Sequence, residues 1–172
     1  MSDYLQQIRI LIVDDQDFIR SILRQMLGVL GAKDIHDARD GEEAWETTTS
    51  VNPDLIIADW EMKPVNGIDF ALRIRNDKAS PNPYVPIIMM TGHSDLKHVI
   101  AARDAGINEF VTKPVAAKAL FDRIVNVIEN PRNFVRADIY FGPDRRRRRI
   151  AIDAERRAAE KVASDEALAA QG

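Results

Sequence analysis

The chain has 172 residues, of which 45% are hydrophobic, and its formal net charge at pH 7 is −3. This length suits one domain with an appended segment. The absence of cysteine excludes disulfides, thiolate metal sites and cysteine nucleophiles. No apolar run approaches the roughly 18 residues of a membrane-spanning helix, so we expect a soluble cytoplasmic protein without a membrane span.

The charge is distributed unevenly along the chain. Residues 1–130 hold 14 Lys and Arg against 20 Asp and Glu, a net charge of −6. Residues 131–172 hold 10 Lys and Arg against 7 Asp and Glu, a net charge of +3. Because Pro131 also follows the last strongly periodic segment, we expect two parts with different roles.

Short apolar runs alternate with amphipathic segments along the first part. The apolar runs predict strands at residues 8–13, 34–38, 55–59, 86–90 and 109–111. Apolar residues at helical spacing predict helices at residues 18–30, 42–50, 68–76, 95–105 and 118–130. Because right-handed crossovers place helices over both faces of the strands, this alternation predicts a doubly wound α/β fold around a five-stranded parallel sheet.

Polar side chains stand where the predicted strands end, and they are Asp14, Asp15, Asp59, Thr91 and Lys113. Ligands bind in open α/β sheets at the carboxyl ends of the strands. Three carboxylates at that edge repel one another unless a cation lies among them, and Mg²⁺ is the natural choice for oxygen ligands. One carboxylate can then take a phosphoryl group while Lys113 and Thr91 neutralise charge on its oxygens. A single acid at a strand end is more commonly a turn residue or helix cap, so the prediction rests on the whole set.

These residues and their surroundings resemble the CheY-like receiver domains of response regulators. The matching motifs are LIVDD (11–15), DGEEA (40–44), LIIADWEM (55–62), NG (66–67), IIMMTG (87–92) and AGINEFVTKP (105–114). The resemblance covers about residues 6–130, which we expect to form the receiver domain. It implies a flavodoxin-like sheet with strand order 2-1-3-4-5.

The resemblance also implies a role for each site residue. Asp59 is the expected phosphoacceptor, and Thr91 and Lys113 are expected to bind the phosphoryl group. Phe110 falls at the family's switch aromatic, although a buried strand phenylalanine is an equal alternative. The expected Mg²⁺ ligands are the carboxylates of Asp14, Asp15 and Asp59 and the backbone carbonyl of Glu61.

Three functions from different classes fit these residues. A two-component signalling module that is phosphorylated by a sensor histidine kinase or phosphotransfer protein, and then switches binding to a downstream protein, is favoured. After residue 130 too little patterned apolar sequence remains for a second core or a DNA-binding domain. An effector controlled by cyclic di-GMP is the alternative. An enzyme such as a haloacid-dehalogenase-like phosphatase is least favoured, because those enzymes usually carry a second aspartate where this chain has Glu61.

The second part of the chain, residues 131–172, lacks the family pattern. Its first stretch contains turn signals and aromatics that look exposed, Phe134, Tyr140 and Phe141. The last stretch is rich in alanine, with opposite charges at helical spacing and little to bury. We expect a flexible or partly helical tail without a core of its own.

A run of five arginines divides this tail, namely Arg145, Arg146, Arg147, Arg148 and Arg149. Guanidinium groups bind phosphates and guanine edges through two parallel hydrogen bonds and stack on bases. The run resembles the arginine-rich C-terminal segment of CheY-like proteins that bind cyclic di-GMP and act on the flagellar motor or chemotaxis. Docking on the acidic receiver, and binding to nucleic acid or to an acidic membrane surface, are the alternatives.

Overall fold

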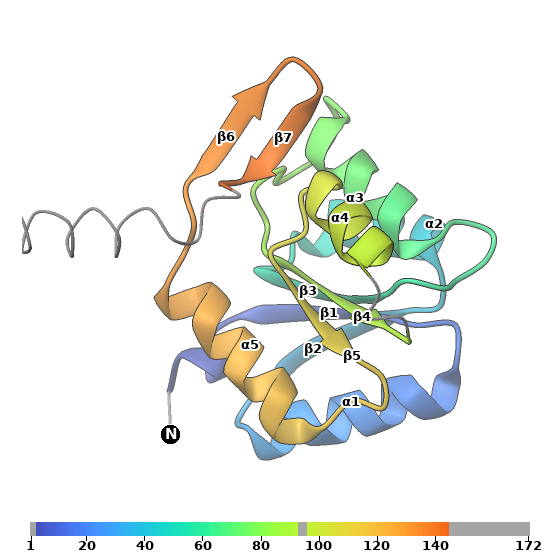
Figure 1. The fold of residues 1–172 in the computed structure, drawn as a ribbon. Coiled ribbons are helices and arrows are strands. Elements are labelled where there is room, and N and C mark those ends of the chain that lie inside the picture. The colour runs from blue at the N-terminus through green and yellow to red at the C-terminus, as the bar shows by residue number, and fades with distance from the viewer. Residues whose placement is uncertain (1–2, 93–95, 145–172) are drawn as a thin grey trace, which may run out of the picture.

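A five-stranded parallel sheet lies at the centre of the protein, in a computed structural model that describes residues 3–92 and 96–144 (Figure 1). Neighbouring strands follow the order β2-β1-β3-β4-β5, and each pair is parallel. The doubly wound, flavodoxin-like fold and its strand order are thereby confirmed. In chain order the strands are β1 (Arg9–Val13), β2 (Asp34–Ala38), β3 (Leu55–Asp59), β4 (Ile87–Thr91) and β5 (Glu109–Thr112).

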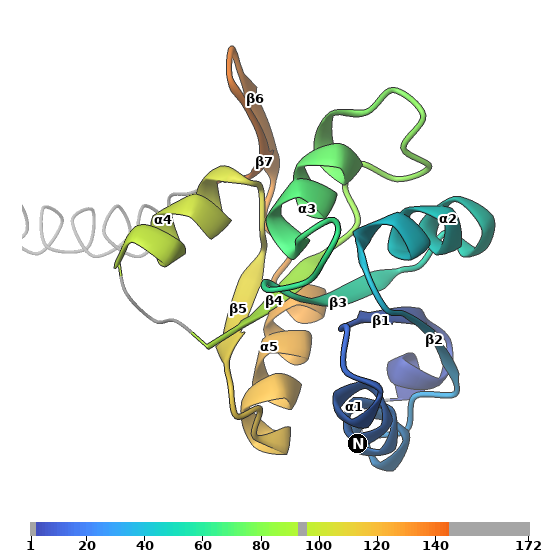
Figure 2. The same ribbon diagram turned by 90° about the vertical axis from the view of Figure 1, so that its right-hand side faces the viewer.

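Helices cover both faces of this sheet. Within the described residues a 3₁₀ helix (Asp3–Gln6) precedes five α-helices: α1 (Asp17–Val29), α2 (Gly41–Val51), α3 (Gly67–Asn76), α4 (Leu96–Asp104) and α5 (Ala117–Glu129). Helices α1 and α5 lie on one face, and α2, α3 and α4 lie on the other (Figure 2). None of the helices in the described part of the chain is long and apolar enough to cross a membrane.

Alternate residues of the strands supply two apolar clusters, one on each face. On β1, Leu11 and Val13 join the cluster under α2, α3 and α4, whereas Ile10 and Ile12 join the cluster under α1 and α5. Every residue of β3 and β4 is buried, because both strands lie inside the sheet. Each fully buried aliphatic side chain contributes roughly 1.5–3 kcal/mol. The strands that end at the predicted site are therefore firmly held.

The loop after β3 returns to the end of that strand. The backbone N–H of Gly67 donates to the carbonyl of Trp60 at 3.0 Å, and a Cβ at Gly67 would lie 2.1 Å from the carbonyl oxygen of Asp59. Only glycine permits this approach. The side chain of Asn66 caps α3 by accepting from the N–H of Asp69 at 2.9 Å. The start of α3 is thus held against the residue predicted to take the phosphoryl group.

The segment after α5 corrects one sequence-based expectation. Instead of a flexible or helical tail, its first part forms an antiparallel hairpin of β6 (Phe134–Ala137) and β7 (Tyr140–Pro143), which rises beside α3 (Figure 1). Tyr140 and Phe141 are buried and Phe134 is half-buried. The expectation that these aromatics are exposed was therefore wrong. Residues 145–172, with the five arginines, lie outside the described residues.

A buried arginine explains where the hairpin docks. Arg75 of α3 is 1% exposed, and its guanidinium donates to Gly106 O at 3.0 Å, Pro83 O at 2.9 Å and Asn108 Oδ1 at 3.1 Å. Burial lowers the pKa of Arg75 to about 9. The ring of Phe134 lies 5.1 Å from its guanidinium carbon. The hairpin therefore covers a cation that lies in the body of the fold.

Candidate phosphoacceptor and metal site

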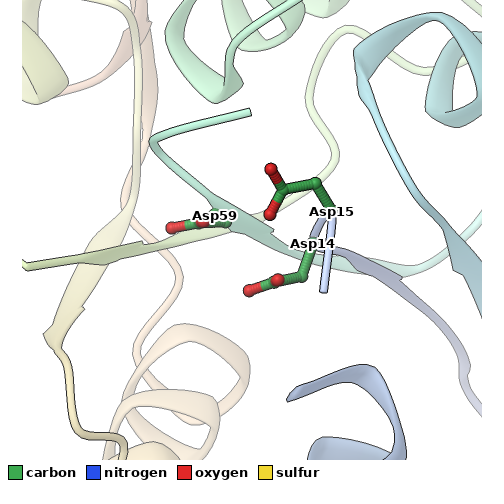
Figure 3. Close-up of side chains that lie close together, drawn as sticks. All are labelled: Asp14, Asp15 and Asp59. Carbon is green, nitrogen blue, oxygen red and sulfur yellow. The ribbon is translucent and has the colours of Figure 1, made fainter. Parts of the chain in front are cut away.

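Three carboxylates meet at the carboxyl edge of the sheet (Figure 3). Asp14 and Asp15 follow β1, and Asp59 ends β3, the strand that pairs directly with β1. One ligand oxygen from each of the three lies within 4.8 Å of the others. Asp14 and Asp59 are buried, whereas Asp15 is exposed. The structure thus brings together the three acids that the sequence predicted, with one of them open to solvent.

Asp14 is fixed through its backbone and both of its carboxylate oxygens. Its N–H donates to Ala38 O at 3.1 Å. Its Oδ1 accepts from the backbone N–H of Gln16 at 2.9 Å, and its Oδ2 accepts from Lys113 Nζ at 3.0 Å. This carboxylate therefore has one orientation before any ligand arrives.

Lys113 contacts two of these acids, Asp14 and Asp59, from the edge of the sheet that β5 forms. It follows β5, and its N–H donates to Thr91 O at 2.8 Å. Its Nζ lies 2.8 Å from Asp59 Oδ2 and 3.0 Å from Asp14 Oδ2. The ammonium bridges two buried carboxylates, as the convergence of strand ends predicted.

The two pKa shifts at this site reflect burial and the pairing of Lys113 with the acids. Burial raises the pKa of Asp59, and the charge of Asp14 raises it further. Hydrogen bonding and charge from Lys113, and a hydrogen bond from the backbone N–H of Glu61, lower it by less. Burial alone would lower the pKa of Lys113, but its bonds to Asp59 and Asp14 raise it overall. Lys113 therefore stays protonated, yet its contacts do not fully offset the cost of burying the Asp59 carboxylate.

The donor set fits a hard divalent cation such as Mg²⁺. All three groups are carboxylates, which suit Mg²⁺ by charge and by ligand type. The exposed Asp15 gives an ion access from solvent, and the raised pKa of Asp59 shows that the pocket favours additional positive charge. Glu61 lies in the adjoining loop with its N–H toward Asp59, and the use of its carbonyl as a ligand stays a prediction.

Thr91 and Phe110 lie next to the acids. Thr91 ends β4 and is 4% exposed, one position beyond the residue that pairs with Asp59. Phe110 on β5 is half-buried and packs against the apolar cluster under α4. Both line one small recess together with Trp60, His98, Val99 and Ala102. Phe110 is thus placed where it fits both the switch and the packing interpretation.

One contact at the site was missed from the sequence. Arg20 of α1 donates from Nη1 to the backbone carbonyl of Asp14 at 2.6 Å. Its spacing of three residues from Asp17, with which it forms an ion pair, reads as an ordinary surface pair on a helix. A contact with a backbone carbonyl leaves no signal in the sequence, so only the structure connects Arg20 to the acids.

The sequence model of the response regulator receiver domain matches residues 10–125. The chain belongs to this family. Among curated relatives, chemotaxis protein CheY1 of Helicobacter pylori is 33% identical over 121 residues, which cover 70% of this chain and 96% of that protein. The CheY homolog of Campylobacter jejuni is 34% identical over 122 residues, covering 70% and 92%. The receiver family, and not the dehalogenase-like phosphatases, is thereby the class of this chain.

Solved structures agree with this receiver assignment. Chemotaxis response regulator CheY4 of Vibrio cholerae superposes with a TM-score of 0.64 at 25% identity, covering 70% of this chain and 98% of that chain. A receiver domain from Clostridium thermocellum gives a TM-score of 0.63 at 29% identity, covering 71% and 94%. The chain is therefore a CheY-like signalling receiver rather than a classical enzyme, and its hairpin lies beyond the matched residues 10–125.

Proposed function

We propose that this receiver accepts a phosphoryl group on Asp59 in a Mg²⁺-dependent reaction and thereby switches its binding to a partner protein. The observation that carries the proposal is the position of Asp59: it is 3% exposed, lies 2.8 Å from Lys113 Nζ, and shares a cluster of ligand oxygens with Asp14 and Asp15. Residues 6–130 form the receiver in this proposal, and residues 131–172 are an appended segment.

Each residue at the carboxyl edge of the sheet has its own role in phosphoryl transfer. A carboxylate oxygen of Asp59 attacks phosphorus, so an O–P bond forms while the N–P bond of a phosphohistidine donor breaks and the electron pair stays with the histidine nitrogen. Lys113, already protonated beside Asp59, neutralises charge on the transferred oxygens, and the Thr91 hydroxyl donates to one of them. Mg²⁺, when held by Asp14, Asp15, Asp59 and the Glu61 carbonyl, supplies the remaining positive charge.

The partners follow from this chemistry. A phosphohistidine donor is a sensor histidine kinase or a phosphotransfer protein, and the acceptor of the signal is a downstream protein that distinguishes the two states of the receiver. Phe110, which shares a recess with Thr91, is the proposed link between the phosphoryl group and the surface. The relatives named above are chemotaxis proteins, and we propose the same kind of pathway here.

The assignment of Asp59 is tested with a small phosphodonor such as acetyl phosphate and mass spectrometry of the intact protein. The wild type is expected to gain one phosphoryl group in Mg²⁺ and none in EDTA. Asp59→Asn is expected to gain none under either condition, whereas Asp77→Asn, which changes an exposed aspartate beyond α3, keeps the labelling of the wild type. Labelling of Asp59→Asn at wild-type level contradicts the assignment.

A second candidate function concerns the five arginines, Arg145 to Arg149. A pocket of about 340 Å³ lies between α4 and β5, and its polar lining consists of Arg103, Arg132, Asn108 and Glu109. The described part of the chain ends at Asp144, whose N–H donates to Asn133 O at 2.7 Å, next in sequence to Arg132. The volume falls in the range of ligand pockets, and the two arginines offer donors for the phosphates of cyclic di-GMP, the proposed second input.

Calorimetric titration of cyclic di-GMP into three proteins tests this candidate. Binding is expected for the full chain, and neither for residues 1–144 nor for the full chain with Arg145 to Arg149 changed to alanine. Equal binding by all three would place the ligand away from the arginine run. Absence of binding to the full chain would remove the candidate and leave the phosphoacceptor proposal untouched.

A further inference from the structure

Arg20 of the first helix contacts three separate oxygens, one of which is the backbone carbonyl oxygen of Asp14 in the acidic cluster. The residue lies in the first turns of α1, and its side chain is 15% exposed. Its Nη1 donates to the backbone carbonyl of Asp14 at 2.6 Å, its Nη2 pairs with the carboxylate of Asp17, and its Nε lies 3.4 Å from Asp37 Oδ2 on β2. A planar guanidinium with three engaged nitrogens has little freedom to move.

The carbonyl that Arg20 holds belongs to the peptide unit that joins Asp14 to Asp15. The Asp14 carboxylate is fixed by other donors, Lys113 and the N–H of Gln16. The Asp15 carboxylate is exposed, and among the described residues no hydrogen bond or ion pair holds it. Its direction therefore depends on the orientation of its own backbone, and Arg20 is the side chain that fixes this peptide unit.

We propose that Arg20 is a positioning residue for the Mg²⁺ site, because it fixes the Asp14–Asp15 peptide and so directs the Asp15 carboxylate toward the cluster with Asp59. The inference rests on the proposed function, since it concerns the same metal site. In this role Arg20 touches neither the metal nor the phosphoryl group. It acts through the placement of a ligand, as partners of metal ligands do.

Electrostatics alone predicts that removal of Arg20 strengthens Mg²⁺ binding. Removing a positive charge near three carboxylates strengthens their attraction for a cation. That gain is limited here, because Asp17 and Asp37 already pair with the Arg20 guanidinium and solvent screens what remains. Loss of orientation is therefore expected to exceed the Coulomb gain, and the sign of the change in Mg²⁺ affinity distinguishes the two effects.

Arg24 provides a matched control one turn further along α1. It pairs with the same Asp37 carboxylate and donates to a backbone carbonyl, Ile35 O, at 2.7 Å. Unlike Arg20, it has no bond to Asp14. Arg24→Ala therefore removes the same charge and a comparable set of contacts, and leaves the peptide before Asp15 unaltered.

The test is a titration of MgCl₂ into the full chain, followed by the amide NMR shifts of Asp15, Trp60 and Glu61. Arg20→Ala is expected to weaken Mg²⁺ binding about tenfold, at the lower end of the range for partners that orient metal ligands. Arg24→Ala is expected to bind as the wild type does. Arg20→Lys is expected to fall between Arg20→Ala and the wild type, because it keeps a donor for the Asp14 carbonyl but loses the fork.

The outcomes of this titration distinguish failure of the positioning role of Arg20 from failure of the proposed Mg²⁺ site. Equal or tighter binding by Arg20→Ala, or an equal loss in Arg24→Ala, overturns the positioning role while Mg²⁺ binding by the wild type upholds the site. If the wild type itself binds no Mg²⁺, the proposed function fails and the inference fails with it. If Arg20→Ala does not give a folded spectrum, the comparison of Arg20→Lys with the wild type carries the test, since wild-type affinity in that variant overturns the proposal.

Discussion

The Nζ of Lys113 lies 2.8 Å from a carboxylate oxygen of Asp59, and these two residues come from strands that have β4 between them. The ammonium therefore reaches across the carboxyl edge of the sheet. In the proposed function, this ammonium neutralises charge on the oxygens of the transferred phosphoryl group. The same contact explains why Lys113 keeps its charge, since its bonds to Asp59 and Asp14 raise its pKa despite burial.

Replacing Lys113 with alanine is expected to slow phosphorylation without removing Mg²⁺ binding. The acids that hold the metal remain, but the transferred oxygens lose a charged donor. Loss of one such donor typically slows a reaction about 100-fold. Stopped-flow phosphorylation by acetyl phosphate in saturating Mg²⁺ measures the rate. Lys118→Ala, which removes an exposed lysine paired with Asp122, is the control, and a wild-type rate in Lys113→Ala contradicts the role given to Lys113.

The raised pKa of Asp59 has a consequence for stability that can be measured without metal. Because burial, together with the charge of Asp14, raises this pKa, the folded protein keeps the proton to a higher pH than the unfolded chain does. Ionisation of Asp59 therefore lowers the free energy of unfolding as the pH rises from the unfolded pKa of about 3.9, and the cost persists at neutral pH. In EDTA at pH 7, Asp59→Asn is expected to be more stable than the wild type in urea, and the difference is expected to shrink as the pH falls toward about 4.

Asp54 is a control of opposite sign. Burial alone would raise the pKa of Asp54, but hydrogen bonds and charge from Arg9 lower it overall. A carboxylate with a lowered pKa stabilises the folded state above its unfolded pKa, and this contribution is lost as the pH falls. Asp54→Asn is therefore expected to reduce stability at pH 7. A loss of stability in both variants would contradict the view that buried negative charge is unfavourable at Asp59.

The close approach of the hairpin to the receiver is testable by adding one methyl group. A Cβ at Gly142 would lie 2.6 Å from the Tyr140 hydroxyl and 2.7 Å from Gly106 Cα. Gly142→Ala is expected to lower the free energy of unfolding by roughly 1–3 kcal/mol, as overpacking of a filled site does. Gly28→Ala in α1, where nothing lies within 4 Å of the added carbon, is expected to stabilise by roughly 0.5–1 kcal/mol. Urea unfolding of both variants provides the comparison, and an unaffected Gly142→Ala would show that the hairpin does not pack as described.

The sheet and its site were predictable because local pattern and global fold agree there. Buried runs such as LIIAD and IIMMT alternate with amphipathic helices, and parallel strands put their carboxyl ends at one edge whatever the loops do. Asp14, Asp59 and Lys113 could therefore be placed together from spacing and family resemblance. Element ends shifted by about one residue; the last helix, for example, was predicted at residues 118–130 and spans Ala117–Glu129.

The hairpin and its anchor were not predictable in the same way. Strand β6 is exposed along most of its length, and Arg75, against which the hairpin packs, lies far back in the sequence. Arg75 reads as a surface arginine on an amphipathic helix, and its burial becomes apparent only when Phe134 and the loop at Gly106 are placed around it. Pairings between distant segments that depend on one buried polar side chain leave no periodic pattern.

Chemical location of the phosphoryl group tests directly whether Asp59 is the phosphoacceptor. The full chain is treated with acetyl phosphate, the acyl phosphate is reduced with borohydride, and the modified residue is identified by tandem mass spectrometry of the peptides. Conversion of Asp59 alone is expected, in Mg²⁺ and not in EDTA. Conversion of a different carboxylate, or of Asp59 to the same extent without the metal, would contradict it.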